Sequence, residues 1–191
     1  MEYLSKKLTD YILEKNVIDK ENYEIYKYGF ESFLETAFCF ASVLVIAAFM
    51  HAIPQALFFS FFFLMMRSYT GGLHLKTFKA CYVSSCLILV ACILLVKNLT
   101  VNPYLSIAIY GASVLAIVLL GPVDHPNKQV DEEDNKRFMF RSYIILAISA
   151  VTAVILFIIK NHSYLFLEGI TFAFTAVTGF LGKHLNKYTV A

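Results

Sequence analysis

The residues best suited to chemistry lie in one short segment, residues 67–81, which reads RSYTGGLHLKTFKAC. It contains one histidine, His74, and one cysteine, Cys81, and the glycine pair Gly71-Gly72 precedes both. A cysteine thiolate is a strong nucleophile, and an imidazole within about 3 Å can act as its general base. The segment therefore has the residue types of a cysteine hydrolase site.

The spacing of these residues requires a break in the helix between them. On one unbroken helix His74 and Cys81 would share a face but stand about 10 Å apart, at a rise of about 1.5 Å per residue. The glycine pair favours irregular backbone, so His74 can lie on a loop that folds back over the next helix. With Thr77 as N-cap, Cys81 lies about one turn inside that helix. There the helix N-terminus and Lys79 favour the thiolate form.

The other cysteines differ from Cys81 in their surroundings. Cys39, Cys86 and Cys92 lie deeper in apolar runs, where loss of hydration disfavours the thiolate. None of the four forms a CxxC pair, so we expect reduced thiols rather than a disulfide framework. The sequence thus distinguishes Cys81 as the candidate nucleophile.

The elements that must position these residues are membrane helices. Of the 191 residues, 59% are hydrophobic and only 16% are charged, and the mean hydropathy is +0.66. A soluble domain has about 45–50% apolar and 25% charged residues. The net charge of +2 gives no reason to expect nucleic-acid binding. The fold class predicted is all-α, a polytopic membrane protein that forms a single domain over residues 1–191.

Six spans are predicted, because backbone groups in lipid must bond within their own helix. They cover approximately residues 33–51, 54–66, 79–97, 103–121, 142–160 and 164–182. The second has only about 13 apolar residues where about 20 are needed. It is therefore either a tilted crossing or one arm of a re-entrant hairpin. Residues 1–30 form an amphipathic segment, with Leu4, Leu8, Tyr11 and Ile12 on one helical face, that lies on the membrane surface or on the rest of the protein.

The distribution of positive charge favours six crossings with both termini in the cytosol. In that topology only Lys97 and Lys160 of the sixteen Lys and Arg residues lie outside. If residues 54–66 did not cross, the basic loop after residue 121 would be external. The outer connections are short, so chemistry is expected at the cytosolic face.

The pattern Arg67-x3-Gly71-Gly72-x-His74-x6-Cys81 in a small polytopic protein resembles the accessory gene regulator protein B family of Gram-positive bacteria. The stretch Gly121-Pro-Val-Asp-His-Pro-Asn-Lys128 is similar to the loop that follows the fourth span in clostridial-type members. The resemblance covers essentially the whole chain and rests on spacing, length and charge layout together.

The resemblance implies a cysteine endopeptidase of the bacterial cell membrane that matures a quorum-sensing pheromone. Members cleave a short propeptide through an acyl-enzyme thioester, and a cysteine of the propeptide then closes a thiolactone ring. By match, Cys81 is the nucleophile and His74 the general base, while Arg67 and Gly72 occupy positions needed for activity. The implied partners are the propeptide, the lipid bilayer and a second copy in a homodimer; no cofactor or metal is implied.

Two alternatives remain open on the residues alone. A zinc site could gather His74, Cys81, Asp124 and His125, although no HExxH or CxxC spacing supports it. A small transporter or membrane scaffold without peptidase activity is the non-enzymatic alternative, but the polar residues cluster at one face and not at the midplane. Asp124, His125 and Glu133 are further candidates to orient His74 or bind the propeptide.

Polar residues within the spans give two further expectations. Glu35 and Glu168 lie near span ends, and we expect each to reach water or a polar partner. Thr171, Thr175 and Gly179 form a small-residue stripe on the last span. Such stripes allow close helix approach, and internal packing is favoured here over a dimer contact.

Overall fold

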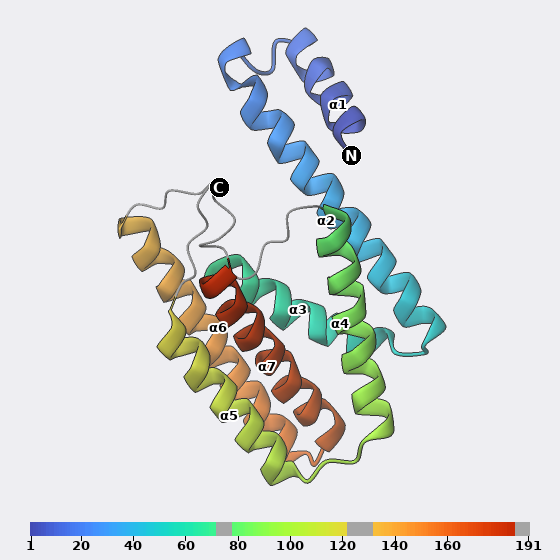
Figure 1. The fold of residues 1–191 in the computed structure, drawn as a ribbon, viewed down its shortest axis with the longest axis vertical. Helices are drawn as coiled ribbons and strands as arrows, with labels where there is room; N and C mark the ends of the chain where they lie inside the picture. Colours follow the sequence, from blue (N-terminus) through green and yellow to red (C-terminus); the bar gives the residue numbers. More distant parts are fainter. Residues whose placement is uncertain (72–77, 122–131, 186–191) are drawn as a thin grey trace.

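A computed structural model of the chain describes residues 1–71, 78–121 and 132–185, and every regular element in these ranges is helical. Figure 1 shows the arrangement. The helices are α1 (Glu2–Glu14), α2 (Tyr23–Phe49), α3 (Ile53–Thr70), α4 (Phe78–Asn98), α5 (Pro103–Leu120), α6 (Glu132–Ile158) and α7 (His162–Leu185), with a short 3₁₀ turn, η1 (Lys20–Asn22), before α2. The all-α polytopic class is confirmed.

Local signals in the sequence explain where helices begin and end. Pro54 and Pro103 lie in the first turns of α3 and α5, where a missing N–H is no loss. The Asn102 side chain accepts a hydrogen bond from the Tyr104 amide (2.9 Å) and caps α5. Gly71 ends α3 with φ 71° and ψ −156°, a conformation that glycine alone adopts readily. The predicted break at the glycine pair is therefore found at its first member.

Five helices are long and apolar enough to cross a membrane, namely α2, α4, α5, α6 and α7. The two described α-helices outside this group are α1 and α3, and α3 contains the predicted short second span. Figure 1 shows α3 running obliquely to α4, α5 and α7. The six crossings remain a prediction, with α3 as the helix on which the count depends.

Contacts between helix ends show which of them lie together at each end of the bundle. At one end Lys97 at the end of α4 bonds to the Met50 carbonyl after α2, and Tyr104 of α5 contacts Phe157 of α6. At the other end Lys183 of α7 donates to the Leu120 carbonyl of α5 (2.8 Å).

At this second end Tyr69 of α3 also contacts Phe138 of α6. We call it the basic end, because its described residues include Arg67, Lys79, Lys136, Arg137, Arg141 and Lys183. Lys97 and Lys160 lie at the opposite end, as the six-crossing topology requires. Which end faces the cytosol stays a prediction.

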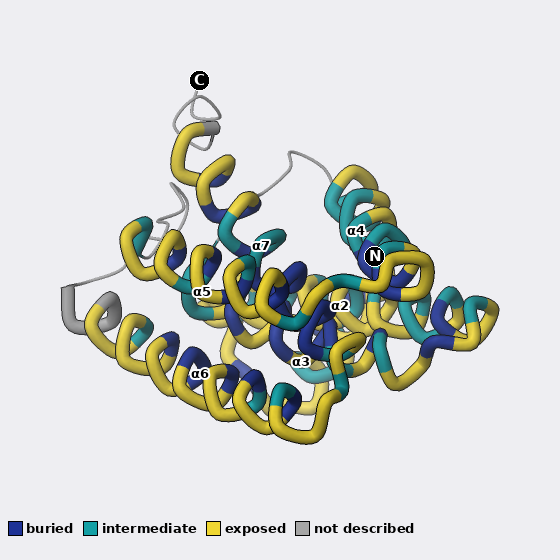
Figure 2. The backbone as a smooth tube through the Cα atoms, turned by 90° about the horizontal axis from the view of Figure 1, so that it is seen from below, coloured by how far each residue is buried: buried dark blue, intermediate teal, exposed yellow. Residues whose placement is uncertain are grey.

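Helix α7 forms the centre of the bundle. It packs against α3, α4, α5 and α6, and 67% of its most apolar 18-residue stretch is buried, against 6% for α2. Figure 2 shows the buried backbone concentrated where α3 and α7 meet.

Two apolar clusters account for this central position. One joins α3, α4 and α7 around Phe59, Leu89 and Leu167, and the other joins α3, α5, α6 and α7 around Met66, Leu146 and Phe172. Both clusters contain residues of α7, so this helix positions its four neighbours relative to one another.

The small-residue stripe on α7 faces inward, as favoured. Thr171 is fully buried and Thr175 is 3% exposed. A Cβ placed on Gly179 would come within 2.9 Å of Leu120 Cδ2 on α5. The stripe therefore allows α5 and α7 to pack closely within one chain.

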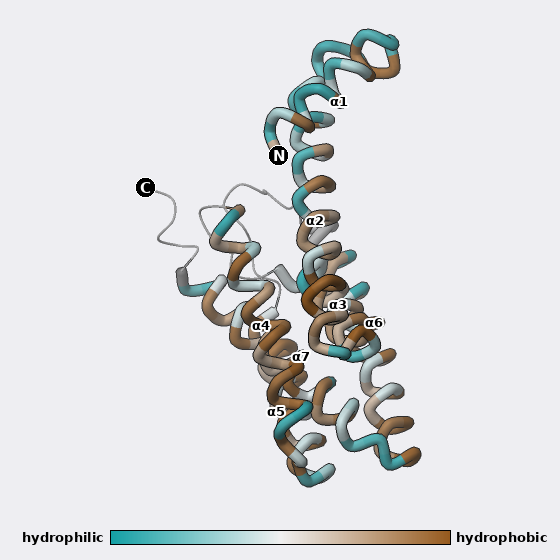
Figure 3. Tube along the Cα trace, turned by 90° about the vertical axis from the view of Figure 1, so that its right-hand side faces the viewer, coloured by the Kyte–Doolittle hydropathy of each residue, from teal (hydrophilic) through white to brown (hydrophobic). Residues whose placement is uncertain are grey.

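Helix α1 packs beside the first part of α2, away from the rest of the bundle (Figure 1). Tyr23 donates a 2.6 Å hydrogen bond to Asp10, and α1 buries the small polar residues Ser5 and Thr9. Its predicted apolar face stays exposed, with Leu4 50% and Tyr11 59% accessible. The amphipathic helix is confirmed, and small residues rather than the apolar face contact α2. Figure 3 shows hydrophilic residues concentrated on α1 and the adjoining part of α2.

Candidate active site

Arg67 and Cys81 lie at the basic end on the two helices that flank the segment with Gly72 and His74. Arg67 is in the last turn of α3, and Cys81 is the fourth residue of α4. Gly72, His74 and the proposed N-cap Thr77 lie outside the described residues. The predicted approach of His74 to Cys81 therefore stays a prediction.

The Arg67 side chain packs over an aromatic ring of its own helix, α3. It is half-buried, and its guanidinium lies 5.9 Å from the centre of the Phe63 ring one turn earlier. A cation over an aromatic face is stabilised by the ring quadrupole. The same guanidinium interacts electrostatically with Cys81. The structure thus brings a fixed positive charge toward the proposed nucleophile.

Cys81 lies at the N-terminal end of α4. It is half-buried in the first turn of α4, and the first four amides of a helix have no partners within it. The positive end of the helix dipole therefore lies beside the sulfur. Its carbonyl oxygen accepts a hydrogen bond from Ser84 (2.9 Å), as expected inside a regular turn.

The other cysteines are placed less uniformly than predicted. Cys92 is fully buried in the cluster of α3, α4 and α7. Cys39 and Cys86 are half-buried, and Cys39 interacts electrostatically with both Cys81 and Cys86. The rings of Phe38 and Tyr82, the neighbours of two of these thiols, lie 5.3 Å apart. Helix α2 therefore brings a second thiol beside the proposed nucleophile, which apolar runs alone do not indicate.

The structure describes only some of the polar residues that are candidates for the site. Asp124 and His125 lie outside the described residues, as does the side chain of Glu133. Glu35 is half-buried on α2, one turn before Cys39, with which it interacts electrostatically. Glu35 therefore lies on the face of α2 that carries the second thiol.

Glu168 departs from the expectation that it would reach water or a partner. Its side chain is completely buried, and neither carboxyl oxygen has a hydrogen-bond partner. Apolar periodicity gave no sign of this, because a helix buried on all sides has no polar face to mark its orientation.

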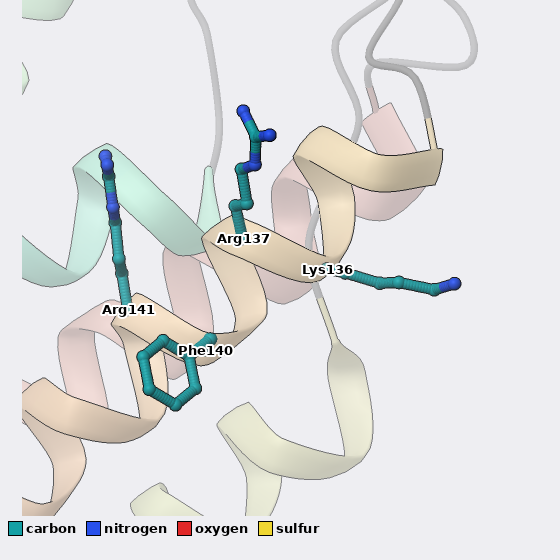
Figure 4. Close-up of a pocket in the computed structure, with 4 residues that line it drawn as sticks. All are labelled: Lys136, Arg137, Phe140 and Arg141. Carbon is teal, nitrogen blue, oxygen red and sulfur yellow. The ribbon is translucent and has the colours of Figure 1, made fainter.

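A surface hollow of about 450 Å³ at the basic end was not predicted. Lys136, Arg137, Phe140 and Arg141 of α6 line it (Figure 4). The Arg141 guanidinium lies 5.7 Å from the centre of the Tyr69 ring, and that ring contacts Phe138 (6.3 Å). The positive charges of α6 are thereby linked to the helix that carries Arg67.

The zinc alternative receives no support from the part of the chain that the structure describes. Within it no group of three His, Cys, Asp or Glu residues could hold a metal ion. Three of the four proposed ligands, His74, Asp124 and His125, lie outside these residues.

Comparison with known proteins identifies the family of the chain. The model of the Accessory gene regulator B family, AgrB, matches residues 5–181. The chain belongs to this family. The match contains α2 to α6 in full and most of α1 and α7, together with every candidate residue named above, so the resemblance drawn from residues 67–81 is confirmed. Membership supports a role in the accessory gene regulator system of quorum sensing and a location in a membrane.

Relatives of the chain are AgrB-like proteins of Firmicutes. One from Clostridium perfringens strain SM101 is 27% identical over 146 residues, which cover 73% of this chain and 68% of the relative. Another, from strain 13 of that species, is 25% identical over 171 residues, covering 85% and 80%. One from Listeria monocytogenes EGD-e is 26% identical over 144 residues, covering 74% and 71%. No solved structure matches the chain.

Proposed function

We propose that this AgrB family member is a cysteine endopeptidase that cleaves a quorum-sensing propeptide at the cytosolic membrane face. The observation that carries the proposal is the placement of Arg67 in the last turn of α3 and of Cys81 in the first turn of α4, which flank the segment with Gly72 and His74. Family membership supports it, and the proposed assembly is a homodimer in the bacterial cell membrane with both termini in the cytosol.

The reaction proceeds through an acyl-enzyme. The Cys81 thiolate attacks the scissile carbonyl carbon, and His74, which has taken the thiol proton, returns it to the leaving amide nitrogen. The C–N bond breaks, and the N-terminal part of the propeptide stays on Cys81 as a thioester. A cysteine thiolate of the propeptide then attacks this thioester, so that a thiolactone forms and the Cys81 thiolate is released.

In this scheme the positive charge of Arg67 stabilises the thiolate form of Cys81. The guanidinium is fixed by Phe63 and half-buried, so its attraction for a thiolate is screened less than at an exposed site. Gly72 follows Gly71, the last described residue before α4, and its role is proposed from the family resemblance. Arg67 and Gly72 are thus proposed as positioning residues, and Cys81 and His74 as catalytic residues.

The energetics demand removal of product and exclusion of water. Exchange of one thioester for another is nearly neutral, whereas conversion of an amide into a thioester is uphill. Release of the C-terminal fragment therefore has to draw the first step forward. A site at the bilayer face limits access of water to the acyl-enzyme.

The proposal is tested with the full chain in lipid nanodiscs and the synthetic propeptide encoded beside its gene. Cys81→Ala and His74→Ala should abolish cleavage, and Cys86→Ala, on the same helix, should retain it. Wild-type protein should accumulate a hydroxylamine-sensitive adduct on Cys81, seen by mass spectrometry. Cleavage by Cys81→Ala at the wild-type rate would refute the assignment. Absence of cleavage and adduct in a folded wild type would favour the transporter or scaffold.

A further inference from the structure

A buried acid in the centre of the bundle has no role in the proposed peptidase reaction. Glu168 lies on α7, six residues after its first residue, about 9 Å along the axis at about 1.5 Å per residue. It is therefore in the half of the bundle opposite the basic end, remote from the proposed chemistry. Its side chain has no exposed surface.

The carboxyl group of Glu168 lacks any group to balance a negative charge. Neither Oε1 nor Oε2 has a hydrogen-bond partner. Moving an unpaired carboxylate from water into a medium of low dielectric constant costs far more free energy than moving a neutral polar group. Lipid around the bundle would supply no water to reduce this cost. An ionised Glu168 without a partner is thus not compatible with the packing around it.

The helices packed against α7 supply no charge for Glu168. Their described titratable residues are Arg67 and Tyr69 on α3, Lys79, Cys81, Tyr82, Cys86, Cys92 and Lys97 on α4, Tyr104 and Tyr110 on α5, and Lys136, Arg137, Arg141 and Tyr143 on α6. Among them Tyr110 interacts electrostatically with Glu168, and its hydroxyl is paired with that of Ser149 (2.7 Å). On α7 itself the other described titratable residues are His162, Tyr164, Lys183 and His184.

We infer that Glu168 binds a positively charged ligand inside the bundle, and that this ligand is a proton. An alkali-metal cation shares the required charge but needs several oxygen ligands around it. The described hydroxyls near Glu168 direct their hydrogen bonds to other groups, since Tyr110 pairs with Ser149 and Thr171 donates to the Leu167 carbonyl (2.7 Å), and no group of three candidate metal ligands is found among the described residues. A proton needs no ligand beyond the carboxyl group. Ionisable residues inside membrane bundles commonly mark functional sites.

The bound proton links the packing of α7 to pH. Gly169, the next residue, approaches the Ser106 carbonyl of α5 so closely that an added Cβ would lie 3.1 Å from it. The helices α5 and α7 are thus closely packed at the residue next to Glu168. The folded protein holds a proton that the unfolded chain releases above about pH 5. Its stability therefore falls as pH rises, by up to about tenfold in the folded-to-unfolded ratio per pH unit.

Infrared spectroscopy of the full chain in nanodiscs tests the protonation directly. With carboxyl-labelled glutamate, the wild type at neutral pH should show the carbonyl band of a protonated carboxylic acid. This band should be lost in Glu168→Gln and kept in Glu35→Gln, which removes a half-buried acid on α2. A wild-type spectrum with only ionised carboxylates at neutral pH would overturn the inference, whether or not the variants fold.

Stability measurements separate the proton from a metal cation. The wild type should lose stability from pH 6 to pH 8 relative to Glu168→Gln, with the same result in sodium and in choline chloride. A sodium-specific gain in the wild type that Glu168→Gln lacks would overturn the proton in favour of a cation. A stability difference that is constant with pH would show a structural role only and overturn the inference. None of these readouts depends on peptidase activity.

Discussion

Arg67, in the last turn of α3, interacts electrostatically with Cys81, in the first turn of α4. The two helices are neighbours in sequence, and α3 ends at Gly71, which has a positive φ. The half-buried cation of Arg67 and the half-buried thiol of Cys81 thus lie on the two helix ends that flank the undescribed segment 72–77.

The first prediction concerns the charge of Arg67. In a background with Cys81 as the only cysteine, Arg67→Gln should slow alkylation of Cys81 by iodoacetamide about tenfold, which corresponds to about 1.4 kcal/mol. Arg67→Lys should retain part of the rate, because it keeps the charge but not the planar group over Phe63.

Arg141→Gln is the matched control, since it removes one positive charge from the same end of the bundle. It should leave the alkylation rate close to that of the parent. Equal slowing in both variants would show that the general potential of the basic end, and not Arg67 itself, acts on Cys81.

The second prediction tests the position of α2 beside the nucleophile. A variant that retains only Cys39 and Cys81 should be bridged within one chain by a short bismaleimide, because α2 brings these half-buried thiols together. Mass spectrometry of the digest identifies the bridged peptides. A variant with only Cys39 and Cys92 should give single adducts at Cys39, since Cys92 is fully buried. Bridging that occurs only between two chains would contradict the arrangement.

Some of these features could be predicted from the sequence, for physical reasons that differ from residue to residue. Long apolar runs require helices, and Pro54, Pro103 and Gly71 mark their limits, so α3, α4, α5 and α7 were found within about four residues of the predicted bounds. The helices α2 and α6 begin about ten residues before the predicted spans, because their polar first turns are also helical. The distribution of positive charge along the sequence predicted that Lys97 and Lys160 lie opposite the basic end of the bundle. These signals act locally or through composition, so one sequence is enough to reveal them.

The relative positions of the helices could not be predicted in the same way. A membrane helix that is apolar on all sides gives no periodic signal for the face it buries. The central place of α7, the burial of Glu168 and the approach of Cys39 to Cys81 therefore came from the structure. The stripe of Thr171, Thr175 and Gly179 is the exception, because small residues mark the side on which two helices meet.

The third prediction concerns the close contact of α5 and α7. Gly169→Ala should destabilise the protein by about 1–3 kcal/mol, because the new Cβ meets the Ser106 backbone carbonyl at 3.1 Å and neither helix can yield alone. Gly179→Ala should cost less, since its Cβ meets the mobile end of the Leu120 side chain. Thermal unfolding in detergent measures both changes.

Gly111→Ala provides the control for that series. It lies in α5, and a Cβ there has no atom within 4 Å, so stability should be unchanged or higher by about 0.5–1 kcal/mol. If Gly169→Ala behaved like Gly111→Ala, α5 and α7 could not be packed as closely as described.

The last prediction tests how α1 is attached to α2. Tyr23 donates a 2.6 Å hydrogen bond to Asp10, and hydrogen bonds to charged acceptors are stronger than those between neutral groups. Tyr23→Phe keeps the ring and removes the hydroxyl, so α1 should detach more often while the bundle around α7 remains intact. Hydrogen exchange should therefore accelerate at α1 amides and stay unchanged in α7. Tyr28→Phe, which alters a tyrosine with 76% of its surface exposed on the same helix, should change neither. Equal exchange in the two variants would mean that the contacts of Ser5 and Thr9 alone hold α1 in place.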